Sequence, residues 1–171
     1  MLNDDLIYSE DVIDYFKIRM TTLLLRIVYP SILGLFISKD TENVDMHLRN
    51  VAETTASSFL KIIVPKGNDP KEIVEKISKL WGRKYTIKRD KNSIIIRTKH
   101  CPLCEEMPTL ELKGHHYCNI VGIFTEVFLN QIHSYKDPKK FKFSDFKVKT
   151  TTSKGSGDDR CEYIITYEKR G

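Results

Sequence analysis

The chain has 171 residues, of which 40% are hydrophobic and 30% are charged. This balance is typical of a globular protein and excludes a disordered chain, and the length fits one domain that buries a core of its own. The 28 basic and 23 acidic residues leave a net charge of +5, which permits an anionic partner but does not demand one.

The start of the chain predicts neither export nor a membrane span. It opens Met-Leu-Asn-Asp-Asp, which is acidic where a signal peptide is basic. The most apolar stretch, residues 18–37, contains Arg19 and Arg26, and an arginine near a bilayer centre costs about 2.5–3.5 kcal/mol. We therefore predict a cytoplasmic protein in which this stretch forms a buried helix or the interface of a homodimer.

The first half of the chain is predicted to be helical, because apolar residues recur there at helical spacing. The predicted helices cover residues 10–37, 42–63 and 70–81. Pro30 should kink or split the first of them. The third begins with Asp69 as its N-cap, followed by Pro70, and Gly82 is suited to end it.

The second half combines strands with one helix. Strands are predicted over residues 84–89, 93–99, 141–152 and 160–168, and a strongly apolar helix over residues 119–133. Helices followed by a hairpin, a helix and a second hairpin indicate an α+β fold, in which N-terminal helices pack on a small antiparallel sheet. We expect residues 1–171 to form a single domain, with residues 1–68 as its helical part and dimer interface and residues 69–171 as its zinc-binding part.

The chain contains four cysteines, and each falls at the end of a predicted element. They are Cys101 and Cys104 after a strand, Cys118 at the start of the apolar helix and Cys161 early in the last strand. The Cys-x-x-Cys spacing lets two sulfurs reach one ion, and a reducing compartment favours metal over disulfide. Four sulfurs match the ligand count of a structural zinc site with none left over. We therefore predict one structural Zn²⁺ bound by all four.

Three other interpretations of the cysteines stay open. His115 or His116 could replace a sulfur at the metal. Cys101 and Cys104 could form a redox pair, although that motif belongs to a βαβ unit, which the sequence does not indicate. The cysteines could also bind no metal. A zinc-dependent or thiol enzyme would need fewer than four protein ligands on the ion or free thiols.

Two further patterns have a structural and a functional interpretation. Glu126 lies on the apolar helix, where it is either a buried site carboxylate or a side chain satisfied by a neighbour, and we favour the second. The lysine-rich segment 136–149 interleaves Phe141, Phe143 and Phe146 with lysines. It could serve as an interaction module for nucleic acid or for another protein, but we favour a half-buried strand with one solvated side and do not expect a nucleic-acid partner.

The order of these motifs resembles the vinyl-4-reductase domain family, also described as hydrocarbon- or small-molecule-binding. The matching stretches are Leu80-Trp81-Gly82, Cys101-x-x-Cys104, Cys118 with Gly122, and the segment 157–163, Gly-Asp-Asp-Arg-Cys-Glu-Tyr. The last is the most specific. The resemblance covers roughly residues 70–168 well and the N-terminal helices only by layout.

The resemblance implies a fold shared with subunits of vesicle-tethering transport particles and with haem nitric-oxide sensor domains. It also implies zinc on Cys101, Cys104, Cys118 and Cys161, a small apolar ligand, and a likeness to stand-alone archaeal members. Reductase activity does not carry over, because the chain has no nucleotide-binding glycine loop and no recognisable redox cofactor site.

Overall fold

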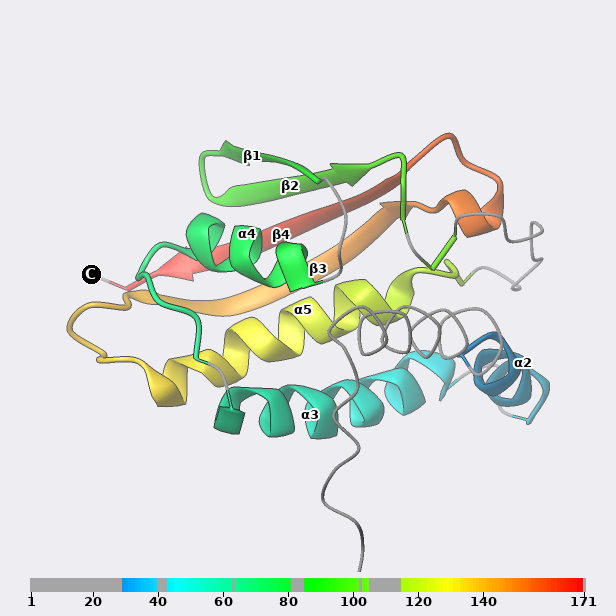
Figure 1. Ribbon diagram of the computed structural model, residues 1–171, viewed down its shortest axis with the longest axis horizontal. Helices are drawn as coiled ribbons and strands as arrows, with labels where there is room; N and C mark the ends of the chain where they lie inside the picture. The colour runs from blue at the N-terminus through cyan, green and yellow to red at the C-terminus, as the bar shows by residue number, and fades with distance from the viewer. Residues whose placement is uncertain are drawn as a thin grey trace, which may run out of the picture.

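The computed structural model describes residues 29–39, 43–62, 64–80, 85–101, 103–104 and 115–170. Its helices and strands follow in the order α2 (Tyr29–Lys39), α3 (Val44–Ile62), α4 (Pro70–Leu80), β1 (Thr86–Asp90), β2 (Ser93–Thr98), α5 (Asn119–Ile132), β3 (Phe143–Thr152) and β4 (Cys161–Lys169). Figure 1 shows the sheet above α5 and α3 beneath α5, with α4 beside the sheet. The predicted α+β class is confirmed.

The sheet has four antiparallel strands in the order β1-β2-β4-β3. The two predicted hairpins therefore join through β2 and β4, where Ile95 lies opposite Ile164. Alternate residues of the two central strands face the helices and are buried, as expected for a sheet with one covered face. These are Ile94, Ile96, Thr98, Cys161, Tyr163, Ile165 and Tyr167.

The core lies on both sides of α5. Its buried residues include Phe128 and Leu129, and the ring of Phe128 meets Phe59 of α3 edge-on with centroids 5.8 Å apart. Ala52 and Ala56 on α3 are also buried, and small side chains let two helices approach closely. These two alanines lie on the face of α3 that packs on α5.

Helix α4 begins as predicted. The Asp69 side chain accepts a hydrogen bond from Lys71 N (2.8 Å), and its carbonyl accepts one from Ile73 N (3.1 Å). The same carboxylate pairs with Arg89 of β1 at 2.8 Å, which ties the helix start to the sheet edge. Gly82, the predicted helix stop, lies outside the described residues.

Two predicted strands have different boundaries in the structure. The predicted strand over 141–152 begins only at Phe143, because the backbone N–H of Phe141 instead donates to Asp137 O (2.9 Å) and closes a turn. The predicted strand over 84–89 runs instead over Thr86–Asp90, because Asp90 pairs with Ser93 across a two-residue turn in which Lys91 has a φ of 43°.

The N-terminal helix can be compared with its prediction only in part. Pro30 lies in α2, but the residues before Tyr29 are outside the described ranges, so the predicted kink or split at Pro30 stays a prediction. Residues 10–28 of the predicted helix lie outside the described residues. No helix in the described ranges is long and apolar enough to cross a membrane.

Candidate metal centre

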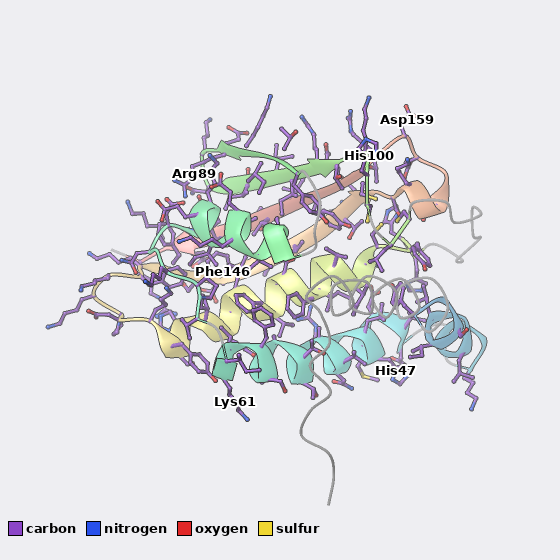
Figure 2. The ribbon with its side chains drawn as sticks, in the orientation of Figure 1. His47, Lys61, Arg89, His100, Phe146 and Asp159 are labelled. Carbon is purple, nitrogen blue, oxygen red and sulfur yellow. The ribbon has the colours of Figure 1, made fainter. Side chains whose placement is uncertain are left out.

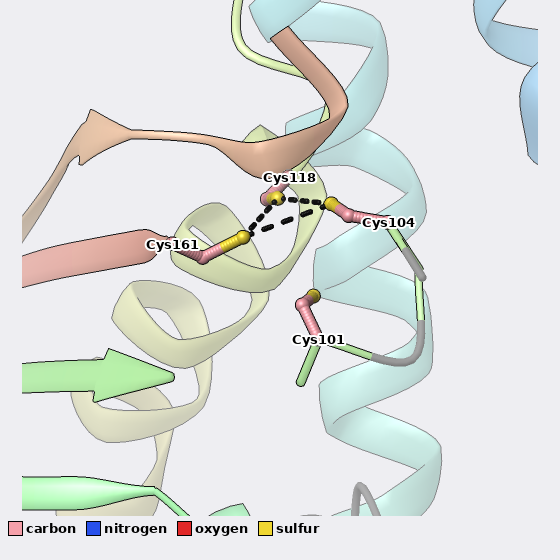
Figure 3. Close-up of side chains that lie close together, drawn as sticks. All are labelled: Cys101, Cys104, Cys118 and Cys161. Carbon is pink, nitrogen blue, oxygen red and sulfur yellow. Dashed lines mark hydrogen bonds between the residues drawn. The ribbon is translucent and has the colours of Figure 1, made fainter. Parts of the chain in front are cut away.

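The four cysteines meet at one end of the sheet. Cys101 and Cys104 follow β2, Cys161 is the first residue of β4, and Thr98 at the end of β2 lies opposite Cys161 in the sheet register. Cys118 directly precedes α5, whose start lies beneath this end of the sheet. The side chains point toward one another from these three places (Figure 3).

The spacing of the sulfurs suits a single metal ion. Cys118 Sγ lies 2.8 Å from Cys104 Sγ and 3.2 Å from Cys161 Sγ, and the Cys104 and Cys161 sulfurs are 3.7 Å apart. All four sulfurs lie within 4.8 Å of one another. In a zinc tetrahedron with Zn–S bonds of about 2.3 Å, neighbouring sulfurs are about 3.8 Å apart. The four cysteines could therefore hold a metal ion after small adjustments.

The site is closed to solvent. All four cysteines are buried and none forms a disulfide. The most exposed of them, Cys104, retains 4% of its surface. A complete set of four buried sulfurs has the chemistry of a structural site, because catalytic zinc keeps one position for water or substrate.

The thiols perturb one another strongly. Hydrogen bonding to Cys104 lowers the pKa of the Cys101 thiol, and the same contact raises the pKa of Cys104. Interaction with Cys101 and burial likewise raise the pKa of Cys118. Closely spaced buried thiols resist ionising together, whereas a divalent cation favours the thiolate at each of its ligands.

Two groups that the sequence did not single out contact the sulfurs. The hydroxyl oxygen of Ser153 lies 3.0 Å from Cys118 Sγ, and the backbone N–H of Lys154 donates to Cys161 Sγ at 3.4 Å. Both belong to the connection between β3 and β4. A serine in a turn carries no sequence signal for such a contact.

The alternative metal ligands do not join the cluster within the described residues. His115 Nδ1 lies 3.5 Å from Asp45 Oδ1 on α3, and His116 lines a separate pocket. Cys101 and Cys104 are joined by a turn in which Cys104 N donates to Cys101 O (3.0 Å). This turn follows β2, a strand of an antiparallel sheet, whereas the redox motif belongs to a βαβ unit with parallel strands.

Glu126 is satisfied by neighbours, as the sequence analysis favoured. Its carboxylate accepts hydrogen bonds from Arg49 Nη2 (2.6 Å) and from the backbone N–H of Val148 on β3 (2.7 Å). It thereby links α3, α5 and β3. The three groups border a pocket of about 230 Å³, in which Arg49 forms its ion pair with Glu126.

The lysine-rich segment 136–149 contains the first part of β3, which is half-buried, and the turn that precedes this strand. Phe141 and Phe146 are almost fully buried and lie in the core, as Figure 2 shows for Phe146. Lys136 donates to Gly67 O (2.9 Å) and to Pro65 O, so it fastens the α3–α4 connection. The two buried phenylalanines are not available to stack on bases.

Comparison with known proteins identifies the fold and no family. No family model and no curated protein matches the chain. Among solved structures, the chain is similar to a trafficking protein particle complex subunit 3 from Naegleria fowleri that is covalently bound to palmitic acid. The TM-score is 0.65 with 14% identity, over 89% of this chain and 98% of that one. The predicted likeness to transport-particle subunits is thus confirmed at the level of the fold.

Proposed function

We propose that the protein is a non-catalytic binding module that is stabilised by one structural zinc ion and takes up a small apolar ligand. The observation that carries the proposal is the closed set of four buried sulfurs on Cys101, Cys104, Cys118 and Cys161. With four protein ligands the ion has no open position for a reacting water. Its contribution is to join the end of β2, the start of α5 and the start of β4.

Zinc is the metal that this ligand set favours. Four thiolates in a tetrahedral arrangement are characteristic of structural zinc or of an iron–sulfur centre. The sulfurs lie within 4.8 Å of one another, which is the spacing expected around one ion. Metal analysis of purified protein, with one zinc per chain expected, tests this part. Protein that contains no metal after expression with zinc would contradict it.

Two likenesses support an apolar ligand. The order of the motifs resembles the vinyl-4-reductase domain family, whose members are described as binding hydrocarbons or other small molecules. The solved structure with the same fold carries palmitic acid. Neither likeness transfers a particular ligand or a covalent bond to this chain, so the proposal is limited to the class of ligand.

A small cavity between the sheet and the helices is the place we propose for the ligand. The cavity has a volume of about 10 Å³. It is lined by side chains of α4, α5 and the sheet, together with the residue that precedes β1: Ser78, Val121, Thr125, Ile96, Val148, Tyr163 and Tyr85. That volume suits one water molecule at most. Because α4 packs against both β1 and α5, we propose that an apolar chain enters by displacing α4 from the sheet.

Binding can be tested at this cavity with palmitic acid as the probe. Native mass spectrometry should detect one palmitic acid per chain. Val121→Phe, which fills the cavity, should abolish binding, whereas Val51→Phe on the exposed side of α3 should not. Thermal unfolding of both variants verifies that they fold. Wild-type protein that binds no palmitic acid, or Val121→Phe that binds it normally, would refute the proposed site.

We also propose a homodimer through the N-terminal helices. Among the described residues, Ile32 and Leu35 of α2 are 41% and 48% exposed. Large apolar side chains exposed side by side on one helix are typical of an association surface. A second copy is the partner that the sequence analysis expects there.

A further inference from the structure

The connection between β3 and β4 covers the metal centre. It runs from Ser153 to Arg160 and contains a short 3₁₀ turn, Lys154–Ser156. Ser153 is fully buried although serine is polar, and Gly155 in the turn is buried as well. Burial of this kind requires a partner for the hydroxyl group.

The partner of the Ser153 hydroxyl is the sulfur of Cys118. The two atoms lie 3.0 Å apart. A thiolate bound to a metal ion has no proton, so the serine must be the donor whenever Cys118 is a ligand. The hydroxyl is thus placed to donate to one of the four sulfurs from outside the ligand set.

A second sulfur receives a hydrogen bond from the backbone of the same connection. Cys161 Sγ accepts from Lys154 N at 3.4 Å. Four thiolates around one divalent cation keep a net negative charge, which is costly to bury without such donors. For Cys118 that donor is a side chain, so a single substitution can remove it.

The turn is anchored independently of the metal. Asp158 accepts a hydrogen bond from Ser153 N (2.7 Å), and Ser156 N donates to Ser153 O (2.9 Å). Gly155 lies against Tyr117, where an added Cβ would come within 2.7 Å of the tyrosine Cβ. These contacts fix the position of the Ser153 hydroxyl before any ion binds.

From this geometry we infer that Ser153 is a positioning residue of the metal centre and that its hydrogen bond to Cys118 raises the affinity of the site for zinc. This inference rests on the proposed zinc site. Partners of metal ligands change metal affinity by about 10–100-fold when they are removed. The loss should therefore appear in the affinity, while the ligand set and the fold stay as they are.

Two alanine variants of the same turn separate this role from general damage to the turn. Ser153→Ala removes the hydrogen bond to the sulfur. Ser156→Ala is the matched control, because its hydroxyl accepts a hydrogen bond from Tyr117 N (3.4 Å) and, among the described residues, is hydrogen-bonded to none of the four cysteine sulfurs. Zinc affinity is measured by competition with a chelator, and cadmium-loaded protein is examined by ¹¹³Cd NMR, which reports on the sulfurs directly.

Ser153→Ala should bind zinc about 10–100-fold more weakly than wild type and should shift the ¹¹³Cd resonance. Ser156→Ala should leave both nearly unchanged. Equal affinity and an equal resonance for the two variants would overturn the inference while leaving the zinc site intact. Wild-type protein that binds neither zinc nor cadmium would overturn the proposed site itself, so the two failures are distinguishable.

Discussion

Cys118 Sγ lies 3.2 Å from Cys161 Sγ, although the two residues are separated by 43 positions in the chain. Cys118 precedes α5, which lies between the sheet and α3, and Cys161 begins β4, a central strand. The contact therefore joins the helix to the centre of the sheet. An ion at this point would hold the helix and the sheet together from one end.

Removal of zinc should lower the thermal stability of the protein. Binding of structural zinc is coupled to folding free energy, and here it ties three elements together. We expect a lower Tm after addition of a chelator, measured by circular dichroism. Cys161→Ser should have a low Tm from the start and should not respond to the chelator. An unchanged Tm of chelated wild-type protein would contradict this prediction.

Loss of the Glu126 carboxylate should destabilise the packing of α5 on β3. Glu126→Ala leaves the Val148 N–H without its acceptor and Arg49 without its ion pair, and we expect a loss of about 2–3 kcal/mol in the free energy of unfolding. Arg49 is 43% exposed, so Arg49→Ala should cost less than about 1 kcal/mol. Urea denaturation measures both, and equal losses would show that the backbone hydrogen bond contributes little.

Acid should remove the contribution of Glu162 to stability. Its carboxylate accepts hydrogen bonds from Arg97 on the neighbouring strand and from Thr151, and the contact with Arg97 is the main reason that the pKa of Glu162 is lowered. The folded pKa lies below the unfolded value of about 4.3, so the contribution is complete above that pH and disappears as the pH falls through the folded pKa.

The variant Glu162→Gln isolates this effect from the release of metal by acid. It should be less stable than wild type at pH 7, and the difference should shrink as the pH is lowered below about 4. Urea denaturation over this pH range, with both proteins under the same zinc conditions, gives the difference directly. A difference that does not change with pH would mean that Glu162 has an ordinary pKa in the folded protein.

Two glycine-to-alanine substitutions should have opposite effects. At Gly155 the new Cβ would come within 2.7 Å of Tyr117, and overpacking of a buried site costs about 1–3 kcal/mol. At Gly34 in α2 an added Cβ meets no atom within 4 Å, so alanine should stabilise the helix by up to about 1 kcal/mol. Thermal unfolding distinguishes the two signs. A neutral Gly155→Ala would mean that the turn can move away from Tyr117.

Association through α2 should be sensitive to charge. Leu35→Glu places a carboxylate in the proposed apolar interface and should convert a dimer into a monomer. Thr166→Glu, at an exposed position on β4, should leave the dimer intact. Light scattering during size-exclusion chromatography gives the mass of each. Wild-type protein that is monomeric at all concentrations tested would rule out the dimer.

The convergence of the cysteines could be predicted because each stands at the end of an element. A pattern of hairpin, helix and hairpin brings such ends together at one edge of a sheet, so Cys118 and Cys161 could be placed near Cys101 and Cys104 without coordinates. The buried face of α3 was predictable for a different reason, because its buried residues recur at every fourth position, as on one face of a helix.

Other features depend on tertiary contacts that local sequence does not encode. Ser153 and Cys118 are 35 positions apart, and the β3–β4 ladder changes register between Thr150 and Thr152, just before the turn that carries Ser153. Arg49 and Glu126 are 77 positions apart, and their pairing follows from the packing of α3 on α5. The strand start at Phe141 was predicted too early because its apolar side chain fits the alternation while its backbone closes a turn.

The four-cysteine zinc site can be examined by X-ray absorption spectroscopy at the zinc edge of the purified protein. We expect one zinc ion per chain with four sulfur neighbours at about 2.3 Å and no nitrogen or oxygen neighbour. A first shell that contains nitrogen or oxygen in place of a sulfur would contradict a closed four-cysteine site, and protein without zinc would contradict the metal centre altogether.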